Sequence, residues 1–250
     1  SFNFFKFSLV VVSISFISIF IFCVALPLLA MAQGSGQPID ISANPALEWD
    51  RQNARYIARG NAVAKQGAST VKADTLTANY DPADSGATDL TVLNADGNVE
   101  IINEDTRIFG QKGTYDLQTE IARVTGDSLK MQAPTMMVTA QEYFEYDARG
   151  GKITAKGNAV ATEGDKRLET DKIIAYMNEN AQGETTVARY EAPGRVKIIT
   201  PTETAVGNSG TYDPVTQKAI LTGNVQITQE HNVCLLYTSP SPRDQRGSRN

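Results

Sequence analysis

The sequence predicts an all-β protein built from tandem repeats. Short runs alternate between apolar and polar residues with a period of two, as in Asn98-Val99-Glu100-Ile101, which is typical of strands with one buried face. The composition, with 19 Gly, 10 Pro and many Thr, Val and Ile, favours strands and turns. We find no convincing helix pattern in the central body. A Gly followed by a polar residue and a β-like run recurs at Gly60, Gly97, Gly126, Gly157, Gly194 and Gly223.

The amino-terminal segment differs from the rest. Residues 7–32 are almost wholly apolar, and Lys6 is the only charge before them. The run ends in Ala30-Met31-Ala32-Gln33, a small-x-small cleavage pattern. We therefore expect residues 1–32 to be a signal peptide cleaved after Ala32, which makes the chain an exported protein. The alternative is an uncleaved membrane anchor, because about 20 apolar residues can span a bilayer.

The body, residues 33–232, shows a repeat at a fixed offset. The spacings between the recurring glycines are 37, 29, 31, 37 and 29 residues, so the pattern restarts after 97 residues. At the same offset, residues 60–64 (Gly-Asn-Ala-Val-Ala) fall on residues 157–161, and residues 113–116 (Gly-Thr-Tyr-Asp) fall on residues 210–213. Identities of this kind predict a tandem duplication of a block of about 97 residues, each made of three smaller units.

Each unit is expected to follow one plan. A strand ends in an aromatic-acidic pair such as Tyr115-Asp116, a turn and a second strand follow, and a Gly-Asn or Gly-Asp turn leads into a third strand. Val71, Ala73, Ala78 and Tyr80 alternate with a slip near residues 74–75, which predicts a bulge. The plan gives roughly a dozen strands or more, and stacking such units buries a continuous apolar stripe, as in solenoids and rolls.

The carboxyl-terminal segment, residues 233–250, is rich in Pro, Ser and Arg and shares nothing with the body. We interpret it as non-native sequence, with a genuine disordered tail as the alternative. The last unit of the second block is expected to be incomplete, because few residues follow Gly223 before this segment.

Charge and composition exclude several kinds of function. The formal net charge is −5; residues 1–32 contribute +1 and residues 233–250 contribute +2, so the body carries −8. An acidic body argues against nucleic acid as a partner. One His and two Cys, all at or beyond the edges of the body, provide neither a catalytic triad nor a zinc site, and no cofactor or metal is expected.

Other candidate motifs receive structural interpretations. The stretch Gly110-Gln111-Lys112-Gly113 is interpreted as a turn between strands rather than a phosphate loop. Acidic pairs such as Glu104-Asp105 are interpreted as solvated loop tips rather than a carboxylate dyad. The recurring tyrosines, at positions 80, 115, 146, 176 and 212, are expected to be structural. Trp49 falls on Tyr146 at the 97-residue offset and is expected to be the same structural wedge.

Together these features resemble the OstA-like family of lipopolysaccharide-transport proteins, over residues 37–230. The resemblance lies in the Gly-Asn units at 60–64, 97–101, 157–161 and 223–227, in the strands at 71–74 and 168–171, and in the Tyr-Asp strand ends at 80–81, 115–116 and 212–213. It does not separate a periplasmic bridge protein from its inner-membrane-anchored partner or from the amino-terminal domain of the outer-membrane translocon.

Membership would imply a β-jellyroll, a rolled antiparallel sheet shaped like a taco and open at both ends. It would also imply a periplasmic protein without enzymatic activity that binds lipopolysaccharide through lipid A. Partners of like fold in the inner and outer membranes would join by edge-strand pairing, and a head-to-tail homo-oligomer would use the same edges. The acidic body departs from what a phosphate-bearing ligand favours.

An apolar groove is the expected binding site, because each acyl methylene moved from water into it gains about 0.8 kcal/mol. The residues expected to line it are Val71, Val99, Ile101, Val124, Leu129, Met131, Val138, Leu168, Val196, Ile198, Leu221, Val225 and Ile227. The alternative is that these residues form a closed dry core. In residues 62–64 and 159–161 the pattern leaves open whether Ala or Val faces inward.

Two other functions compete with a lipid-transport bridge. A structural or assembly β-solenoid would have a filled interior, whereas a carbohydrate-active β-helix enzyme would show a surface cleft with paired carboxylates. A continuous open groove would favour the transport bridge.

Overall fold

The computed structural model describes residues 39–82, 90–103, 105–179, 185–229 and 232–235. These residues form a 17-stranded sheet in which every pairing is antiparallel, so the predicted all-β class is confirmed. No helix in this part of the chain is long and apolar enough to cross a membrane. The predicted signal peptide, residues 1–32, lies outside the described residues.

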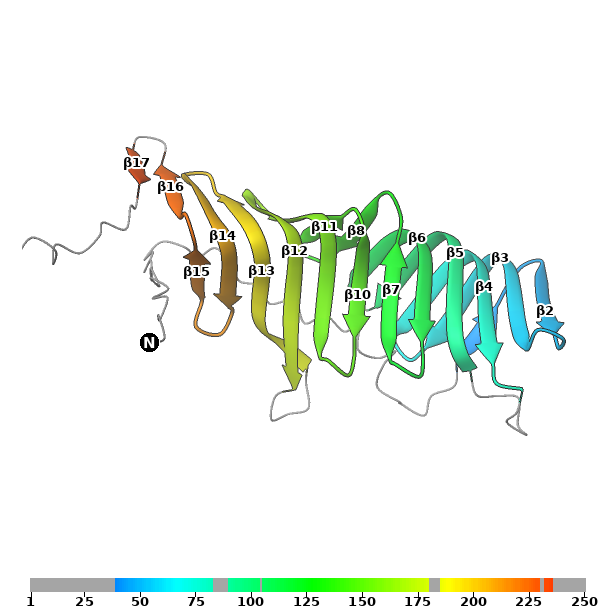
Figure 1. Cartoon of the computed structure of the whole chain (residues 1–250). Coiled ribbons are helices and arrows are strands. Elements are labelled where there is room, and N and C mark those ends of the chain that lie inside the picture. The colour runs from blue at the N-terminus through cyan, green and yellow to red at the C-terminus, as the bar shows by residue number, and fades with distance from the viewer. Residues whose placement is uncertain (1–38, 83–89, 104, 180–184, 230–231, 236–250) are drawn as a thin grey trace, which may run out of the picture.

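The strands lie side by side along the molecule, from β2 at one end to β17 at the other (Figure 1). They are β1 (Asp40–Ser42), β2 (Ala46–Asp50), β3 (Arg55–Gln66), β4 (Ser69–Tyr80), β5 (Leu90–Asn103), β6 (Thr106–Asp116), β7 (Ile121–Thr125), β8 (Leu129–Gln132), β9 (Met137–Ala140), β10 (Tyr143–Asp147), β11 (Lys152–Glu163), β12 (Lys166–Glu179), β13 (Thr185–Ile199), β14 (Glu203–Asp213), β15 (Lys218–Thr222), β16 (Gln226–Gln229) and β17 (Asn232–Leu235). Strand β17 crosses the boundary that the sequence suggested between residues 232 and 233.

The sheet folds over on itself into two layers. Long strands contribute to both layers, whereas short strands contribute to one. Strand β6 pairs with β7 through residues 112–116 and with β8 through residues 107–109. Strand β11 likewise pairs with β10 through its first half and with β9 through its second half. The two layers therefore meet along a corner that runs the length of the molecule, which is the rolled sheet that the resemblance implied.

The corner is made by bulges inside the long strands. The pairing register shifts between Arg59 and Ala62, between Asp96 and Val99, and between Lys156 and Ala159. The residues in between are the Gly-Asn pairs, and both members of each pair have positive φ, for example 76° at Gly60 and 45° at Asn61. An extra residue in left-handed conformation bends a strand and increases its twist. The sequence interpretation of such pairs as turns between strands was wrong at 60–61, 97–98 and 157–158, because the strand continues through them. It is confirmed at 126–127, between β7 and β8, and at 223–224, between β15 and β16.

Two further sequence predictions concern a phase slip in β4 and the glycine-flanked segment at residues 110–113. The phase slip predicted near residues 74–75 is confirmed, because the buried positions of β4 change from Val71 and Ala73 to Leu76 and Ala78. The segment Gly110-Gln111-Lys112-Gly113, predicted to be a turn, lies inside β6. A Cβ at Gly110 would come within 2.4 Å of Val124 Cγ1, so this glycine lets two strands approach closely at the corner.

Strand bounds recur at an offset of 97 residues. Strands β2 and β10 are related in this way, and so are β3 and β11, β6 and β14, β7 and β15, and β8 and β16. The two halves join where β7 pairs with β10 and β8 pairs with β9. Each half therefore presents the same series of strands, one after the other along the sheet.

Candidate functional site

The inner surfaces of the two layers carry cross-strand rows of apolar side chains. In the first layer, one row passes from partner to partner through every strand. We call it the tyrosine row: Trp49, Tyr56, Ala78, Leu93, Tyr115, Ala122, Tyr146, Ile153, Ala175, Tyr190, Tyr212 and Ala219. Directly opposed side chains on one face of antiparallel strands are in contact range, so the row is continuous.

The second layer carries a matching row without aromatic residues. We call it the aliphatic row: Ile41, Ala64, Val71, Ile101, Ile108, Met131, Val138, Ala161, Leu168, Ile198, Ala205 and Ile227. Its eleven inter-strand steps, at about 4.8 Å each, make it roughly 50 Å long. Both rows face the space between the layers.

That space is an apolar trough in three overlapping sections. The middle section has an empty volume of about 780 Å³ and is lined by Ile101, Ile108, Val138 and Leu168 on one side and by Val124, Phe144 and Tyr146 on the other, among others. The first section, of about 570 Å³, shares Ile101 and Tyr146 with it. The last section, of about 410 Å³, shares Leu168 and Tyr190 with it. These volumes include solvent on the open side.

Most of the residues predicted to line a groove face this space. Ten of the thirteen line at least one section: Val71, Val99, Ile101, Val124, Met131, Val138, Leu168, Val196, Ile198 and Leu221. The other three are not among the lining residues: Leu129 and Val225 are buried, and Ile227 packs against a buried cluster around Val196. In residues 62–64 and 159–161 the alanines face inward, because Ala62, Ala64, Ala159 and Ala161 are all buried.

The sequence analysis missed most of the wall formed by the first layer, apart from Val124 and Leu221. Phe144, Tyr146, Ile153, Ala155 and Tyr190 all line the middle section. Five tyrosines had been noticed as a recurring feature, but a structural role alone was assigned to them. Their inward position becomes evident only from the pairing of the strands, because Tyr146 lies opposite Ala122 and Ile153 in a row of inward-facing residues.

The Tyr-Asp motif has a separate role for each of its residues. The tyrosine points into the trough, and burial raises the pKa of Tyr146 to about 12. The aspartate closes the following turn: Asp116 Oδ1 accepts hydrogen bonds from the backbone N–H groups of Gln118 and Thr119, both at 2.9 Å. These N–H donors hold the pKa of Asp116 below its usual value, with the bond from Thr119 the largest cause. The motif thus fixes where a strand ends and which side chain enters the trough.

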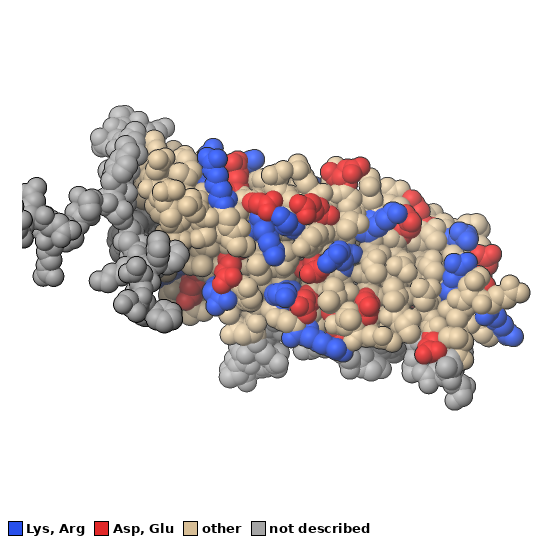
Figure 2. Space-filling view, in the orientation of Figure 1, with Lys and Arg blue, Asp and Glu red and all other residues tan. Residues whose placement is uncertain are grey.

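The outer face of the sheet carries charged side chains that form ion pairs with one another. Lys and Arg alternate with Asp and Glu over the visible face of the sheet (Figure 2). Glu100 accepts from both Lys72 and Arg107, at 3.1 and 3.0 Å, and Arg123 pairs with Glu145 across the junction of the two halves. Within the described residues no group of three or more His, Cys, Asp or Glu side chains is placed to hold a metal ion.

The end of the sheet at β2 differs from the middle. Leu47 and Trp49 expose 61% and 48% of their surface, whereas Phe144 and Tyr146, 97 residues later, expose 5% each. Strand β10 pairs on both sides, but within the described residues β2 pairs with β3 alone. The expectation that Trp49 is the same buried wedge as Tyr146 was therefore wrong. Trp49 stacks on Tyr56 with ring centroids 5.7 Å apart, and its Nε1–H donates to Tyr80 Oη at 3.1 Å.

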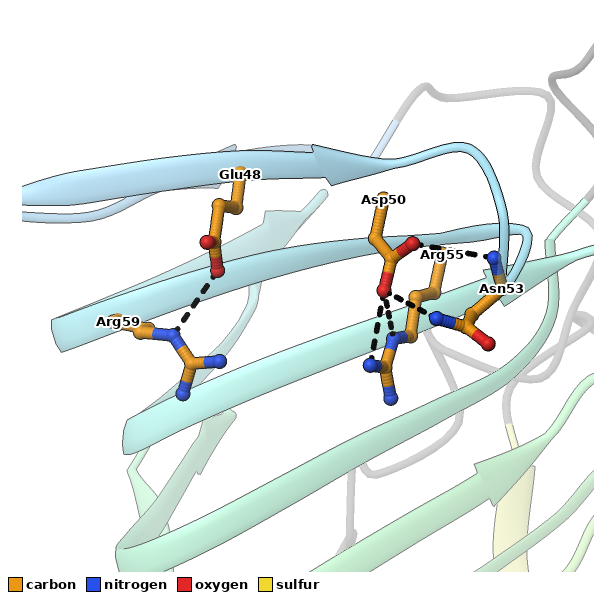
Figure 3. Close-up of polar contacts among 5 residues, drawn as sticks. All are labelled: Glu48, Asp50, Asn53, Arg55 and Arg59. Atoms are coloured by element: carbon orange, nitrogen blue, oxygen red, sulfur yellow. Dashed lines mark hydrogen bonds and ion pairs between the residues drawn. The ribbon is translucent and has the colours of Figure 1, made fainter.

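Ion pairs on the other face hold this end hairpin in place. Arg59 Nε lies 3.2 Å from Glu48 Oε2, and Arg55 binds Asp50 Oδ2 at 2.9 Å (Figure 3). Asn53 donates from its side-chain amide to the same carboxylate at 2.8 Å. The β2–β3 hairpin is thus fixed by polar contacts outside and presents apolar side chains inside.

Comparison with known proteins identifies the family. A family model described as "LptA/(LptD N-terminal domain) LPS transport protein" matches residues 40–143 and again residues 137–234. The chain belongs to this family. The two matches begin 97 residues apart, the same offset that relates the strands of the two halves.

The family assignment agrees with the OstA-like resemblance found in the sequence and places the chain in lipopolysaccharide transport. Among solved structures, the chain is similar to LptH from Pseudomonas aeruginosa, the LptA homologous periplasmic component of the conserved lipopolysaccharide transport device. The identity is 16%, the TM-score is 0.26, and the match covers 56% of this chain and 76% of LptH. No curated protein sequence matches the chain.

Proposed function

We propose that the chain binds lipopolysaccharide in the periplasm by holding its acyl chains in the trough, without chemical turnover, and that it bridges the two membranes. The observation that carries the proposal is the continuous apolar space between the tyrosine row and the aliphatic row. A structural solenoid would fill this space with its own side chains, whereas an alkyl chain gains about 0.8 kcal/mol for each methylene buried there. The ten predicted groove residues that line the trough are the proposed contacts, together with Phe144, Tyr146 and Tyr190.

The strand register supports a specific way of joining chains end to end. Inside the chain, the second half attaches to the first because β10 pairs with β7. By the 97-residue offset, β2 at one end is equivalent to β10, and β15 at the other end is equivalent to β7. Pairing of β15 of one copy with β2 of another would repeat the internal junction. It would place Lys218 opposite Asp50, Ala219 opposite Trp49 and Leu221 opposite Leu47.

Such pairing would serve transport because it continues the tyrosine row, and with it one wall of the trough, from one copy into the next. Edge strands with unpaired backbone groups are suited to strand addition. Proteins of the same fold in the inner and outer membranes would be accommodated by the same geometry. The bridge is thus proposed to be a series of rolled sheets with one shared trough.

Lipid binding is tested by two variants of neighbouring residues. Ile101 lines two sections of the trough, whereas Ile102 follows it on the opposite face of β5, opposite Arg107. Ile101→Asp introduces a polar group into an apolar site, a change that costs about 1–3 kcal/mol, so the affinity for purified lipopolysaccharide should fall by about fivefold to 150-fold. Ile102→Asp should change it less than about twofold.

Native mass spectrometry of the chain with and without purified lipopolysaccharide measures the adduct, and circular dichroism verifies that both variants are folded. Equal lipid retention by the two folded variants would contradict the assignment of the trough. A folded wild-type chain that forms no adduct would contradict the proposed function itself.

A further inference from the structure

A row of polar side chains bounds the apolar inner surface of the first half at one rim, where β3 and β5 end and β4 and β6 begin. Gln66, Ser69, Asn103 and Thr106 are successive register partners across β3, β4, β5 and β6. Ser69 and Asn103 are 0% and 1% exposed, and Thr106 is 3% exposed. The row lies on the inward side, because Val71 and Ile101, two residues further along the same faces of β4 and β5, line the trough.

The polar atoms of the central pair have no partner among the described residues. Ser69 Oγ, Asn103 Oδ1 and Asn103 Nδ2 are all buried without a hydrogen bond, although the two residues lie directly opposite each other. Buried polar groups are nearly always hydrogen-bonded, and an unsatisfied one is unfavourable. Three such atoms at one place need a partner that the described residues do not supply. Neither residue is exposed, so a ligand group would reach them only from the side of the trough, next to Val71 and Ile101.

The second half does not repeat this feature. At the 97-residue offset, the four positions are occupied by Glu163, Lys166, Thr200 and Glu203, all of which are partly exposed. The neutral buried row therefore belongs to the first half alone and is not a requirement of the fold. The row itself carries no charge, and the nearby cations Lys72 and Arg107 are paired with Glu100 on the outer face.

We propose that Ser69 and Asn103 form a neutral hydrogen-bonding subsite for the hydroxyl, ester or amide group that adjoins the alkyl chain of a bound lipid. The subsite rests on the proposed function, because it needs an alkyl chain in the trough. Two residues along a strand span roughly 7 Å, so a chain lying against Val71 and Ile101 carries a polar group a few carbons away to this pair. Asn103 offers both a donor and an acceptor, and Ser69 offers either. The pair thereby sets the position of the lipid along its own chain direction.

The test compares two probes of equal chain length, a saturated fatty acid and its 3-hydroxy counterpart, by competition for the whole chain. One net hydrogen bond to a neutral buried group corresponds to roughly threefold to tenfold in affinity, so the wild-type chain should prefer the hydroxylated probe by about that factor. In the double variant Ser69→Ala, Asn103→Leu the preference should fall to about one, while the plain fatty acid binds at least as tightly as before.

Thr170→Val is the matched control, because Thr170 Oγ1 is also buried without a partner but lies in the second half, opposite Val196. It should leave the preference unchanged. Thermal unfolding without lipid gives a second readout: Asn103→Leu should be at least as stable as the wild type, because no protein bond is lost.

The subsite is overturned if the preference for the hydroxylated probe survives in the double variant, or if Thr170→Val loses it equally. It is also overturned if Asn103→Leu markedly destabilises the lipid-free protein, because that would show a structural role of Asn103 through internal water. If the wild type retains lipopolysaccharide but binds neither probe, the subsite alone fails; if it retains no lipopolysaccharide either, the proposed function fails and the subsite fails with it.

Discussion

Trp49 is the residue at which the proposed end-to-end pairing can be tested most directly. Its side chain is 48% exposed at the free end of the sheet, whereas Tyr146, at the equivalent position inside the chain, is 5% exposed. Pairing through β2 should bury about two-fifths of the tryptophan side chain, or roughly 90 Å². At about 25 cal/mol per Å², this burial contributes about 2 kcal/mol, which corresponds to about 30-fold in an association constant.

We therefore expect Trp49→Ala to weaken self-association of the chain by about 30-fold, measured by sedimentation equilibrium over a range of concentrations. Leu47→Ala should weaken it by about fivefold, because the smaller side chain contributes about 1 kcal/mol. Met137→Ala is the control, since Met137 is 40% exposed but lies on β9 in the middle of the sheet. Self-association that is unchanged by Trp49→Ala would refute the assignment of this end as the contact surface.

The register is tested separately by disulfide formation between two singly substituted chains in which Cys23 and Cys234 are replaced by Ser. Glu48 and Ile220 are equivalent to the internal partners Glu145 and Arg123, so cysteines at these positions should lie opposite each other. Opposed Cα atoms, about 4.5–5.5 Å apart, are within disulfide range. Cysteines at Glu48 and Lys218 are two residues out of register and should cross-link much more slowly. Equal rates for the two combinations would contradict the proposed register.

Two further predictions concern the corner and the tyrosine row. Gly60→Ala should lower the free energy of unfolding by about 2–4 kcal/mol, because φ is 76° and the new Cβ would lie 2.4 Å from the backbone oxygen of Asn44. The control Gly164→Ala, with φ 53° and nothing within 4 Å of the new Cβ, should lower it by only about 1 kcal/mol. Equal losses in chemical denaturation would argue against a steric role for the glycine at the corner. The raised pKa of Tyr146, about 12 against about 10 in the unfolded chain, contributes stability that is fully present below about pH 10 and is lost as the pH rises towards about 12. Urea unfolding between pH 9 and pH 12 should show this decline, and Tyr146→Phe should remove part of it; an identical pH dependence in both proteins would show that the phenol does not titrate differently on folding.

The all-β class was predictable because its main signal is local, whereas the rolled shape of the sheet followed only from the family resemblance. Alternation such as Val99 and Ile101 against Glu100 identifies the inward face of a strand without knowledge of its neighbours. The Gly-Asn pairs show where this local reading stops. A left-handed Gly-Asn pair fits a turn and a bulge equally well, and only the partner strands on either side decide between them. The pairs at 60–61 and 97–98 have such partners, so the strand passes through them.

The candidate site was predicted mainly in one layer, and most of the other layer was missed for a similar reason. The groove prediction relied on strongly alternating Val and Ile runs, and seven of its thirteen residues lie on the aliphatic row. The opposite wall mixes large and small residues, as in Tyr115, Ala122 and Tyr146. In the sequence its tyrosines were therefore recognised only as residues at the ends of strands. Trp49 and Tyr146 have matching local patterns yet differ in exposure, because only one of them has a strand on each side.

The uniform lining of the trough bears on how a lipid would move through it. The aliphatic row offers Ile, Val, Leu, Met and Ala side chains at each step of about 4.8 Å, so an alkyl chain that shifts by one strand exchanges one set of apolar contacts for a similar one. Uniform binding of this kind holds the chain out of water but creates no gradient along the trough. Direction must therefore be imposed at the ends, by delivery of new lipid at one edge strand and removal at the other. A polar pair such as Ser69 and Asn103 would be the one place in the first half where a lipid pauses in a defined position, and its absence from the equivalent positions of the second half makes the two halves of the path unequal.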